Sequence, residues 1–148
     1  MNAAHLTDTS LNELLLHIYE DQDMYGIAAK HVQDEALASF IDEKLQERLQ
    51  VEAALKKLLK ERAVRSEQQG TLIGKARMAW LDIKAVFSNN TKETLINGLY
   101  KGDCLTLRYF KKLLKKLDLS AEQRRVVEQQ MALVNDGIKQ LETMKSQA

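Results

Sequence analysis

The sequence predicts an all-α fold, in which four long helices form a bundle and a shorter helix connects the second to the third. The 148 residues contain no proline and six glycines. Apolar residues recur every three or four positions, and no segment sustains the alternation of period two that is typical of a β-strand. A chain of this length can bury roughly two-thirds of its unfolded surface, so a core without disulfides suffices. We therefore expect residues 1–148 to form a single domain.

The first two helices are predicted to form a hairpin. The first begins after a cap at Thr9 or Ser10 and covers residues 10–31, and the second begins at the cap Asp34 and covers residues 34–63. The positions that we expect to face the core are Leu11, Leu15, Ile18, Gln22, Tyr25, Ala29 and Val32 in the first helix, and Leu37, Ile41, Leu45, Leu49, Glu52, Leu55 and Leu59 in the second.

A connector and a second hairpin complete the prediction. The connector covers residues 71–87 and carries Trp80 on its apolar side. Thr91 caps a helix over residues 91–117, and Ser120 with Gln123 forms a capping box for a helix over residues 120–146. Two hairpins joined by one long connection favour an up-down-down-up or ferritin-like four-helix bundle.

Carboxylates interrupt the apolar faces of three predicted helices. Asp21 lies next to Gln22, Glu52 lies between leucines, and Asp103 lies between Leu99 and Leu107. A carboxylate removed from water must find a cation, a hydrogen-bond network, a proton or a metal ion. One interpretation is therefore a carboxylate metal site, for iron or manganese, and its candidate ligands are Asp21, Glu47, Glu52 and Asp103.

Histidine spacing argues against a complete di-iron site. Bundles of that kind use a Glu-x-x-His pattern, and no acidic residue of the second or fourth long helix is followed by a histidine at that step. All three histidines, His5, His17 and His31, lie near the start of the chain. We therefore favour a buried ion pair with Arg48 or Arg108, and no cofactor.

Other catalytic chemistry finds no support in the sequence. It contains no G-x-S-x-G, no glycine-rich phosphate loop and no C-x-x-C. The single cysteine, Cys104, follows Asp103, whose negative charge would oppose formation of a thiolate. We expect a protein that is not an enzyme.

Several short motifs occur in a characteristic order. They are Leu11-Asn12-Glu13-Leu14, Asp21, Tyr25, Glu47-Arg48, Arg77, Trp80-x-Asp82-Ile83-Lys84-Ala85 and Gly102-Asp103. In this order the chain resembles an uncharacterised bacterial family of ferritin-like four-helix-bundle proteins, a domain of unknown function. The resemblance implies a ferritin-like bundle without an established reaction. It also implies lost metal chemistry, because the family tends to carry glutamate where this chain has Asp103, and often histidine where it has Ile138.

Charge is distributed unevenly along the chain. Residues 1–55 contain 3 basic and 11 acidic residues, whereas residues 56–117 contain 15 basic and 5 acidic ones. Such surfaces can mediate association, so we expect a homo-oligomer or a protein partner. The absence of an export signal and of a long apolar run predicts a cytoplasmic protein without a membrane span.

A basic segment near the end of the third long helix provides an alternative. Lys111, Lys112, Lys115 and Lys116 could bind an acidic lipid surface or a nucleic acid. Tyr109 alone offers no platform for stacked bases, so the sequence argues against nucleic-acid binding.

Overall fold

A computed structural model describes residues 3–64, 70–89 and 91–147 of the chain. Within them lie five α-helices and one short 3-10 helix, and no strand. The elements are α1 (Ala3–His31), α2 (Glu35–Glu61), α3 (Gly70–Ala85), η1 (Val86–Asn89), α4 (Lys92–Lys116) and α5 (Ala121–Gln147). The predicted all-α fold is confirmed.

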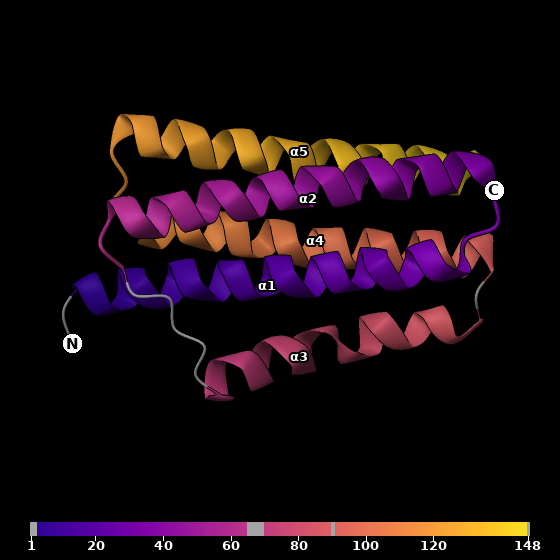
Figure 1. Ribbon diagram of the computed structural model, residues 1–148, viewed down its shortest axis with the longest axis horizontal. Helices are drawn as coiled ribbons and strands as arrows, with labels where there is room; N and C mark the ends of the chain where they lie inside the picture. The colour runs from indigo at the N-terminus through magenta and orange to yellow at the C-terminus, as the bar shows by residue number, and fades with distance from the viewer. Residues whose placement is uncertain (1–2, 65–69, 90, 148) are drawn as a thin grey trace.

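Four long helices, α1, α2, α4 and α5, lie side by side along most of their length (Figure 1). The helix α3 lies outside them, next to α1, and returns the chain to the end at which α4 begins. As a result α2 and α4 run in the same direction, and α1 and α5 run opposite to both. This is the up-down-down-up order expected from two hairpins and a long connection. Among the described residues, none of the helices combines the length and the apolar composition that a membrane span requires.

The predicted helix caps have partners in the structure. The Leu37 backbone N–H donates to Asp34 Oδ2 at 2.9 Å, and Thr91 forms a capping box with Thr94 at the start of α4. At the start of α5, the Gln123 N–H donates to Ser120 Oγ at 3.1 Å and the Ser120 N–H donates to Gln123 Oε1 at 3.3 Å. These bonds satisfy amide groups that have no partner inside the helix.

The predicted start of the first helix is wrong. The helix α1 begins at Ala3, so Thr9 and Ser10 lie inside it and do not cap it. The upstream segment contains Ala3 and Ala4, which are strong helix formers, and these propagate the helix past the two hydroxyl residues. The connector also ends earlier than predicted, because α3 stops at Ala85 and the chain tightens into η1.

The core has two apolar parts. One contains Leu14 and Ile18 of α1 with Leu55, Phe110 and Val134, and the other contains Met24 with Ile41, Trp80, Leu99 and Leu141. Along α1, Asp21 lies between the residues of the first part and those of the second, and Arg48 does so along α2. The polar interior therefore separates two hydrophobic cores.

The predicted buried face of the second helix is partly wrong. Leu49 is 54% exposed and Leu45 is only half-buried, whereas Lys44, Arg48 and Val51 are buried. The buried positions thus follow the steps 37, 41, 44, 48, 51 and 55. Two cations can occupy this face because carboxylates meet them there.

Candidate functional site

Five hydrogen-bonded side chains from three helices lie at the centre of the polar interior, and we name them the buried charge cluster: Asp21 and Tyr25 of α1, Arg48 of α2, and Asp103 and Thr106 of α4. The Arg48 guanidinium donates from Nε to Asp21 Oδ2 at 2.8 Å and from Nη2 to Asp103 Oδ1 at 2.9 Å. The Tyr25 hydroxyl donates to Asp103 Oδ2 at 2.6 Å, and the Thr106 hydroxyl donates to Asp21 Oδ2 at 3.2 Å. Arg48 therefore links the two carboxylates.

Burial governs the electrostatics of this cluster. Burial raises the pKa of Asp21 well above its usual value, and the neighbouring charge of Asp103 adds to the rise. Although burial lowers the pKa of Arg48, Asp103 and Asp21 raise it overall, so the guanidinium stays charged. A proton on Asp21 would leave one carboxylate for one guanidinium, which makes the cluster electrically neutral.

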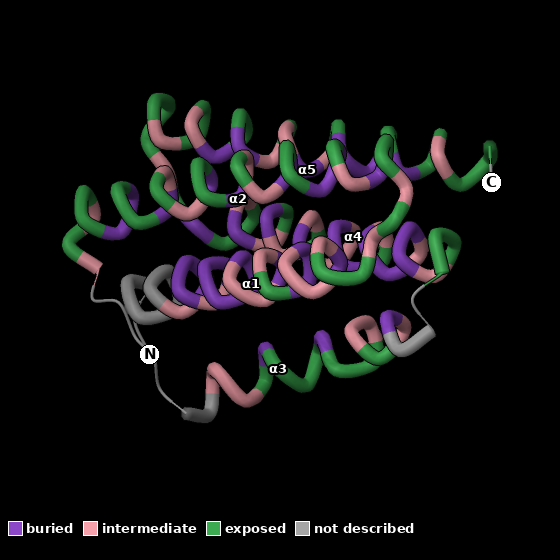
Figure 2. Tube along the Cα trace, turned by 45° about the vertical axis from the view of Figure 1, so that its right-hand side comes forward, coloured by how far each residue is buried: buried purple, intermediate pink, exposed green. Residues whose placement is uncertain are grey.

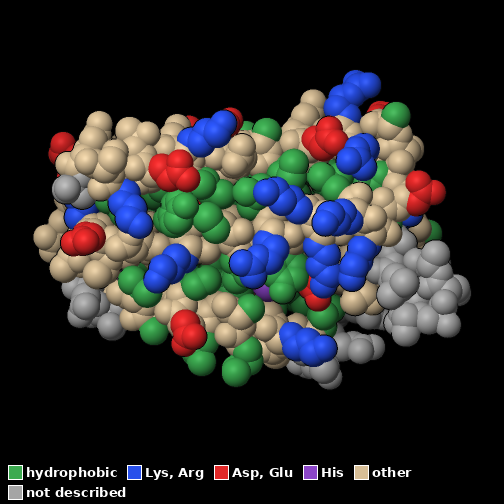
Figure 3. Space-filling model, turned by 180° about the vertical axis from the view of Figure 1, so that it is seen from behind, with side chains coloured by type: hydrophobic (Ala, Val, Ile, Leu, Met, Phe, Trp, Pro, Cys, Tyr) green, Lys and Arg blue, Asp and Glu red, His purple; other side chains and the backbone are tan. Residues whose placement is uncertain are grey.

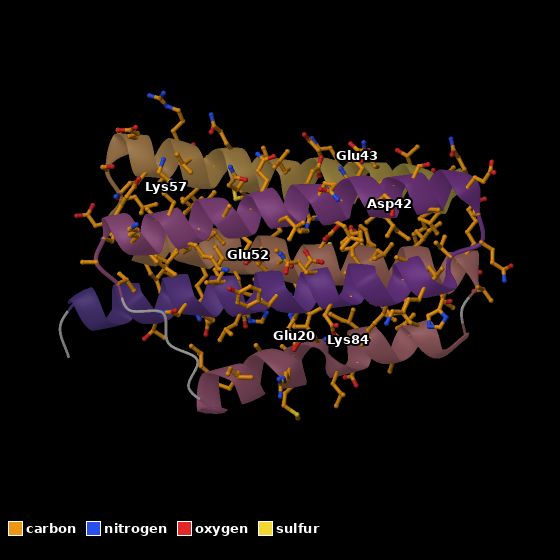
Figure 4. All side chains as sticks on the ribbon, viewed as in Figure 1. Glu20, Asp42, Glu43, Glu52, Lys57 and Lys84 are labelled. Atoms are coloured by element: carbon orange, nitrogen blue, oxygen red, sulfur yellow. The ribbon has the colours of Figure 1, made fainter. Side chains whose placement is uncertain are left out.

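The four predicted metal ligands do not come together around one point. Asp21 and Asp103 meet at Arg48. Glu47 accepts from Lys44 Nζ at 2.9 Å, and Glu52, which lies on α2 (Figure 4), accepts from Gln22 Nε2 at 2.8 Å and pairs with Lys56. Among the described residues, no group of three or more His, Cys, Asp or Glu side chains could hold a metal ion.

The donor set as folded does not fit iron or manganese. Such ions need several oxygen or nitrogen ligands that face one point, whereas the space between Asp21 and Asp103 holds a guanidinium. Only Asp21 Oδ1 among the carboxylate oxygens of the cluster lacks a hydrogen-bond partner in the described residues. The assignment of Asp21, Glu47, Glu52 and Asp103 as metal ligands stays a prediction from the sequence. The expected ion pair with Arg48 is confirmed.

A second group of buried residues attaches α3 to the long helices. Trp80 has no exposed surface, and its Nε1–H donates to His17 Nδ1 at 2.8 Å. The His17 ring stacks on Tyr109, with 3.6 Å between the ring centroids. Burial, and to a smaller extent the charge of Lys112, lower the pKa of His17 to about 4. The imidazole is therefore neutral near pH 7 and can accept a hydrogen bond from the indole N–H.

Close packing and ion pairs complete this attachment. A Cβ atom added at Gly102 would clash with the Met24 side chain and would lie 2.6 Å from Trp80 Cζ3, so these two side chains occupy the space that a larger residue at position 102 would need. Lys84 Nζ lies 2.6 Å from Glu20 Oε2 and 2.7 Å from Asp23 Oδ2, and Figure 4 shows Lys84 and Glu20 between α3 and α1.

The outer surface of α4 carries a row of cations. Lys101, Arg108 and Lys115 recur every seven residues, and Lys111 lies one turn from Arg108 and from Lys115. We name these four exposed residues the basic stripe. None of the four forms an ion pair with a carboxylate in the part of the chain that the structure describes. Figure 3 shows Lys and Arg side chains gathered on the half of this face that contains the end of α4.

Some of the hydrogen-bond and ion-pair partners could not be predicted from the sequence. Lys112, which the sequence grouped with the other lysines, pairs with Glu13 of α1. Tyr25 was expected in the core, but not as a donor to Asp103. The buried face of α2 follows steps of four and three residues from Leu37 through Lys44 and Arg48 to Leu55. This spacing was visible in the sequence, but two of its positions carry cations among the apolar residues.

Comparisons with known proteins place the chain in a family. No curated protein and no solved structure matches it. A family model described as a domain of unknown function, DUF2383, matches residues 7–116, which extend from within α1 to the end of α4. Because this match covers more than half of the 148 residues, the chain belongs to the DUF2383 family.

Proposed function

We propose that this chain is a cytoplasmic, ferritin-like bundle that acts as a binding module, not as an enzyme, and that its basic stripe binds an acidic surface of a protein partner. The observation that carries the proposal is the contrast between the charges inside and outside the bundle. Inside, Arg48 holds Asp21 and Asp103, whereas Lys101, Arg108, Lys111 and Lys115 are exposed and have no acidic partner among the described residues.

The geometry of the stripe suits an extended partner. Residues 101–115 of α4 span about 21 Å, given the rise of 1.5 Å per residue in an α-helix. Lys101, Arg108 and Lys115 lie along one line of the helix surface and Lys111 lies beside it, so an acidic strand or helix placed along this side of α4 could meet all of them. Charges of this kind steer association and give it specificity, and salt weakens the attraction.

The neighbouring residues favour protein over nucleic acid. Single-stranded nucleic acids use exposed aromatic rings as stacking surfaces. Near the stripe, Phe110 is fully buried and Tyr109 already stacks on His17, with Lys112 Nζ 5.4 Å from its centroid. The side chains interleaved with the cations are instead half-buried leucines, Leu107 and Leu114, and apolar groups beside charges are common in protein interfaces.

The test uses a poly-glutamate peptide as the acidic probe. Binding is measured by fluorescence anisotropy at several salt concentrations, in parallel with double-stranded DNA and with vesicles of phosphatidylserine. We expect the peptide to bind best, with an affinity that falls as salt rises. The double variant Lys111→Glu/Lys115→Glu should weaken its binding at least about tenfold.

A matched double variant controls for net charge. Lys57→Glu/Lys60→Glu makes the same change in charge at exposed positions of α2, and it should leave binding of the peptide unchanged. Tighter binding of DNA or of the vesicles would reject the acidic protein surface as partner. Equal losses in the two double variants, or no binding of any probe, would reject the stripe as a binding site.

A further inference from the structure

The outward side of α3 exposes large apolar residues. Met78 is 71% exposed and Leu81 is 60% exposed, whereas Ala76 and Trp80, on the other side of the same helix, are buried. In Figure 2 the buried positions of α3 lie on the side of the long helices, and exposed and intermediate positions cover the remainder. Two large apolar side chains one turn apart thus face away from the core.

These residues form a continuous line along the helix. Gly74, Met78, Leu81 and Ala85 follow at steps of four, three and four, which place them on one face of an α-helix. A Cβ atom added at Gly74 would meet nothing within 4 Å. We name these four residues the apolar line of α3, and its large members lie in the middle.

Two opposite charges flank the apolar line on one side. Lys75 and Asp82 are both exposed and lie seven residues apart, about 10.5 Å along the helix, which is too far for them to pair with each other. Within the described residues neither forms an ion pair. The opposite flank faces α1: Lys84 is held there by Glu20 and Asp23, and the exposed Arg77 lines a groove together with Glu20.

We propose that the outer face of α3 is a homodimer interface, in which a second copy of this chain places its own α3 antiparallel against the first. In that arrangement residues of one flank meet residues of the same flank of the second copy. Lys75 of each copy then meets Asp82 of the other. Met78 and Leu81 of one copy pack against Met78 and Leu81 of the other. The two-fold axis makes each ion pair occur twice, and it closes the assembly at two copies.

The size of this face sets the strength of the dimer. The 16 residues of α3 span about 24 Å, and one helix pair of that length buries less area than a standard stable interface. We therefore expect a monomer–dimer equilibrium that shifts with concentration. The surface differs from the basic stripe, so this inference does not depend on the proposed acidic partner.

The experiment is a dilution series in the analytical ultracentrifuge with charge-reversed variants. Lys75→Asp alone, or Asp82→Lys alone, places like charges opposite each other twice per dimer. Each variant should weaken self-association about tenfold. A mixture of the two variants restores both attractions, so it should form a heterodimer about as strong as the wild-type dimer, as should the double variant Lys75→Asp/Asp82→Lys.

Apolar substitutions provide a matched comparison. Met78→Ser/Leu81→Ser should abolish the dimer, whereas Leu49→Ser, at the exposed leucine of α2, should leave it intact. All substituted positions are exposed, and circular dichroism checks that each variant is folded. The inference is overturned if the wild type stays monomeric throughout the series, if mixing the charge variants restores nothing, or if Leu49→Ser disrupts the dimer as strongly as Met78→Ser/Leu81→Ser.

Discussion

The Arg48 guanidinium has no exposed surface and donates to two buried carboxylates, so few single changes should affect this protein more. Arg48→Met keeps a long side chain but leaves Asp21 and Asp103 without a cation. We expect a loss of about 3–5 kcal/mol in the free energy of unfolding, the range for an uncompensated buried charge. Urea denaturation measures it, and a loss under about 1 kcal/mol would contradict this view of the cluster.

The pH dependence of this variant distinguishes charge from packing. Without Arg48, the Asp21 carboxyl group loses the cation that lowers its pKa, so its folded-state pKa lies still further above the unfolded value and the folded state binds more protons. The variant should therefore recover stability as the pH falls from about 7 to about 5. The triple variant Asp21→Asn/Arg48→Met/Asp103→Asn removes all three charges and should regain most of the loss.

At the scale of single residues, the sequence predicted which carboxylate is buried better than it predicted the partner of that carboxylate. Asp103 between leucines indicated a buried carboxylate that required a partner, and Arg48 was one of two candidates. The choice between them depends on how α2 and α4 are rotated. Arg108 belongs to the exposed face of α4, whereas Arg48 lies one turn after the buried Lys44. Rotation of this kind follows from tertiary packing, which local spacing reports only in part.

At the scale of elements, helix existence and capping could be predicted, while faces and some ends could not. Asp34, Thr91 and Ser120 cap helices as expected because capping is a local interaction. Leu49 was misplaced because exposed and buried leucines look alike in a sequence. The attachment of α3 could be predicted only in part. Trp80 was on the predicted apolar side, but its acceptor His17 lies 63 residues away in the sequence.

The attachment of α3 should be sensitive to acid. The folded-state pKa of His17 is about 4, below the value of 6.5 in the unfolded chain. At pH values between these two, the unfolded state therefore binds a proton that the folded state does not bind. The stability that depends on neutral His17 is complete above about pH 6.5 and decreases as the pH falls, by up to about 3 kcal/mol near pH 4.

A non-titrating variant isolates this effect. His17→Asn retains an acceptor near the position of Nδ1 but binds no proton, so it should be less stable than wild type at neutral pH and lose less stability on acidification. The measurement is urea denaturation of both proteins at about pH 7 and about pH 4.5. Equal losses in the two proteins would assign the acid sensitivity to carboxylates elsewhere.

For the whole molecule, two cores flank one charged layer, and all four long helices contribute to that arrangement. Val127 and Val134 of α5 pack in the first core and Leu141 in the second. Beside the charged layer, a Cβ atom added at Gly137 would lie 3.4 Å from Lys44 Cε and 3.6 Å from Asp103 Oδ2. The family match ends at residue 116, before α5 begins, although both cores need that helix.

Removing α5 should therefore unfold the remainder. A chain of residues 1–119 loses the buried Val127, Val134, Ile138 and Leu141 and exposes the surfaces that they cover. Each such side chain contributes about 1.5–3 kcal/mol, so together they approach the total stability of a typical domain. We expect no cooperative thermal transition by circular dichroism. A chain of residues 1–144 retains Leu141 and should melt close to the full chain, and a cooperative transition in residues 1–119 would show that the matched region folds by itself.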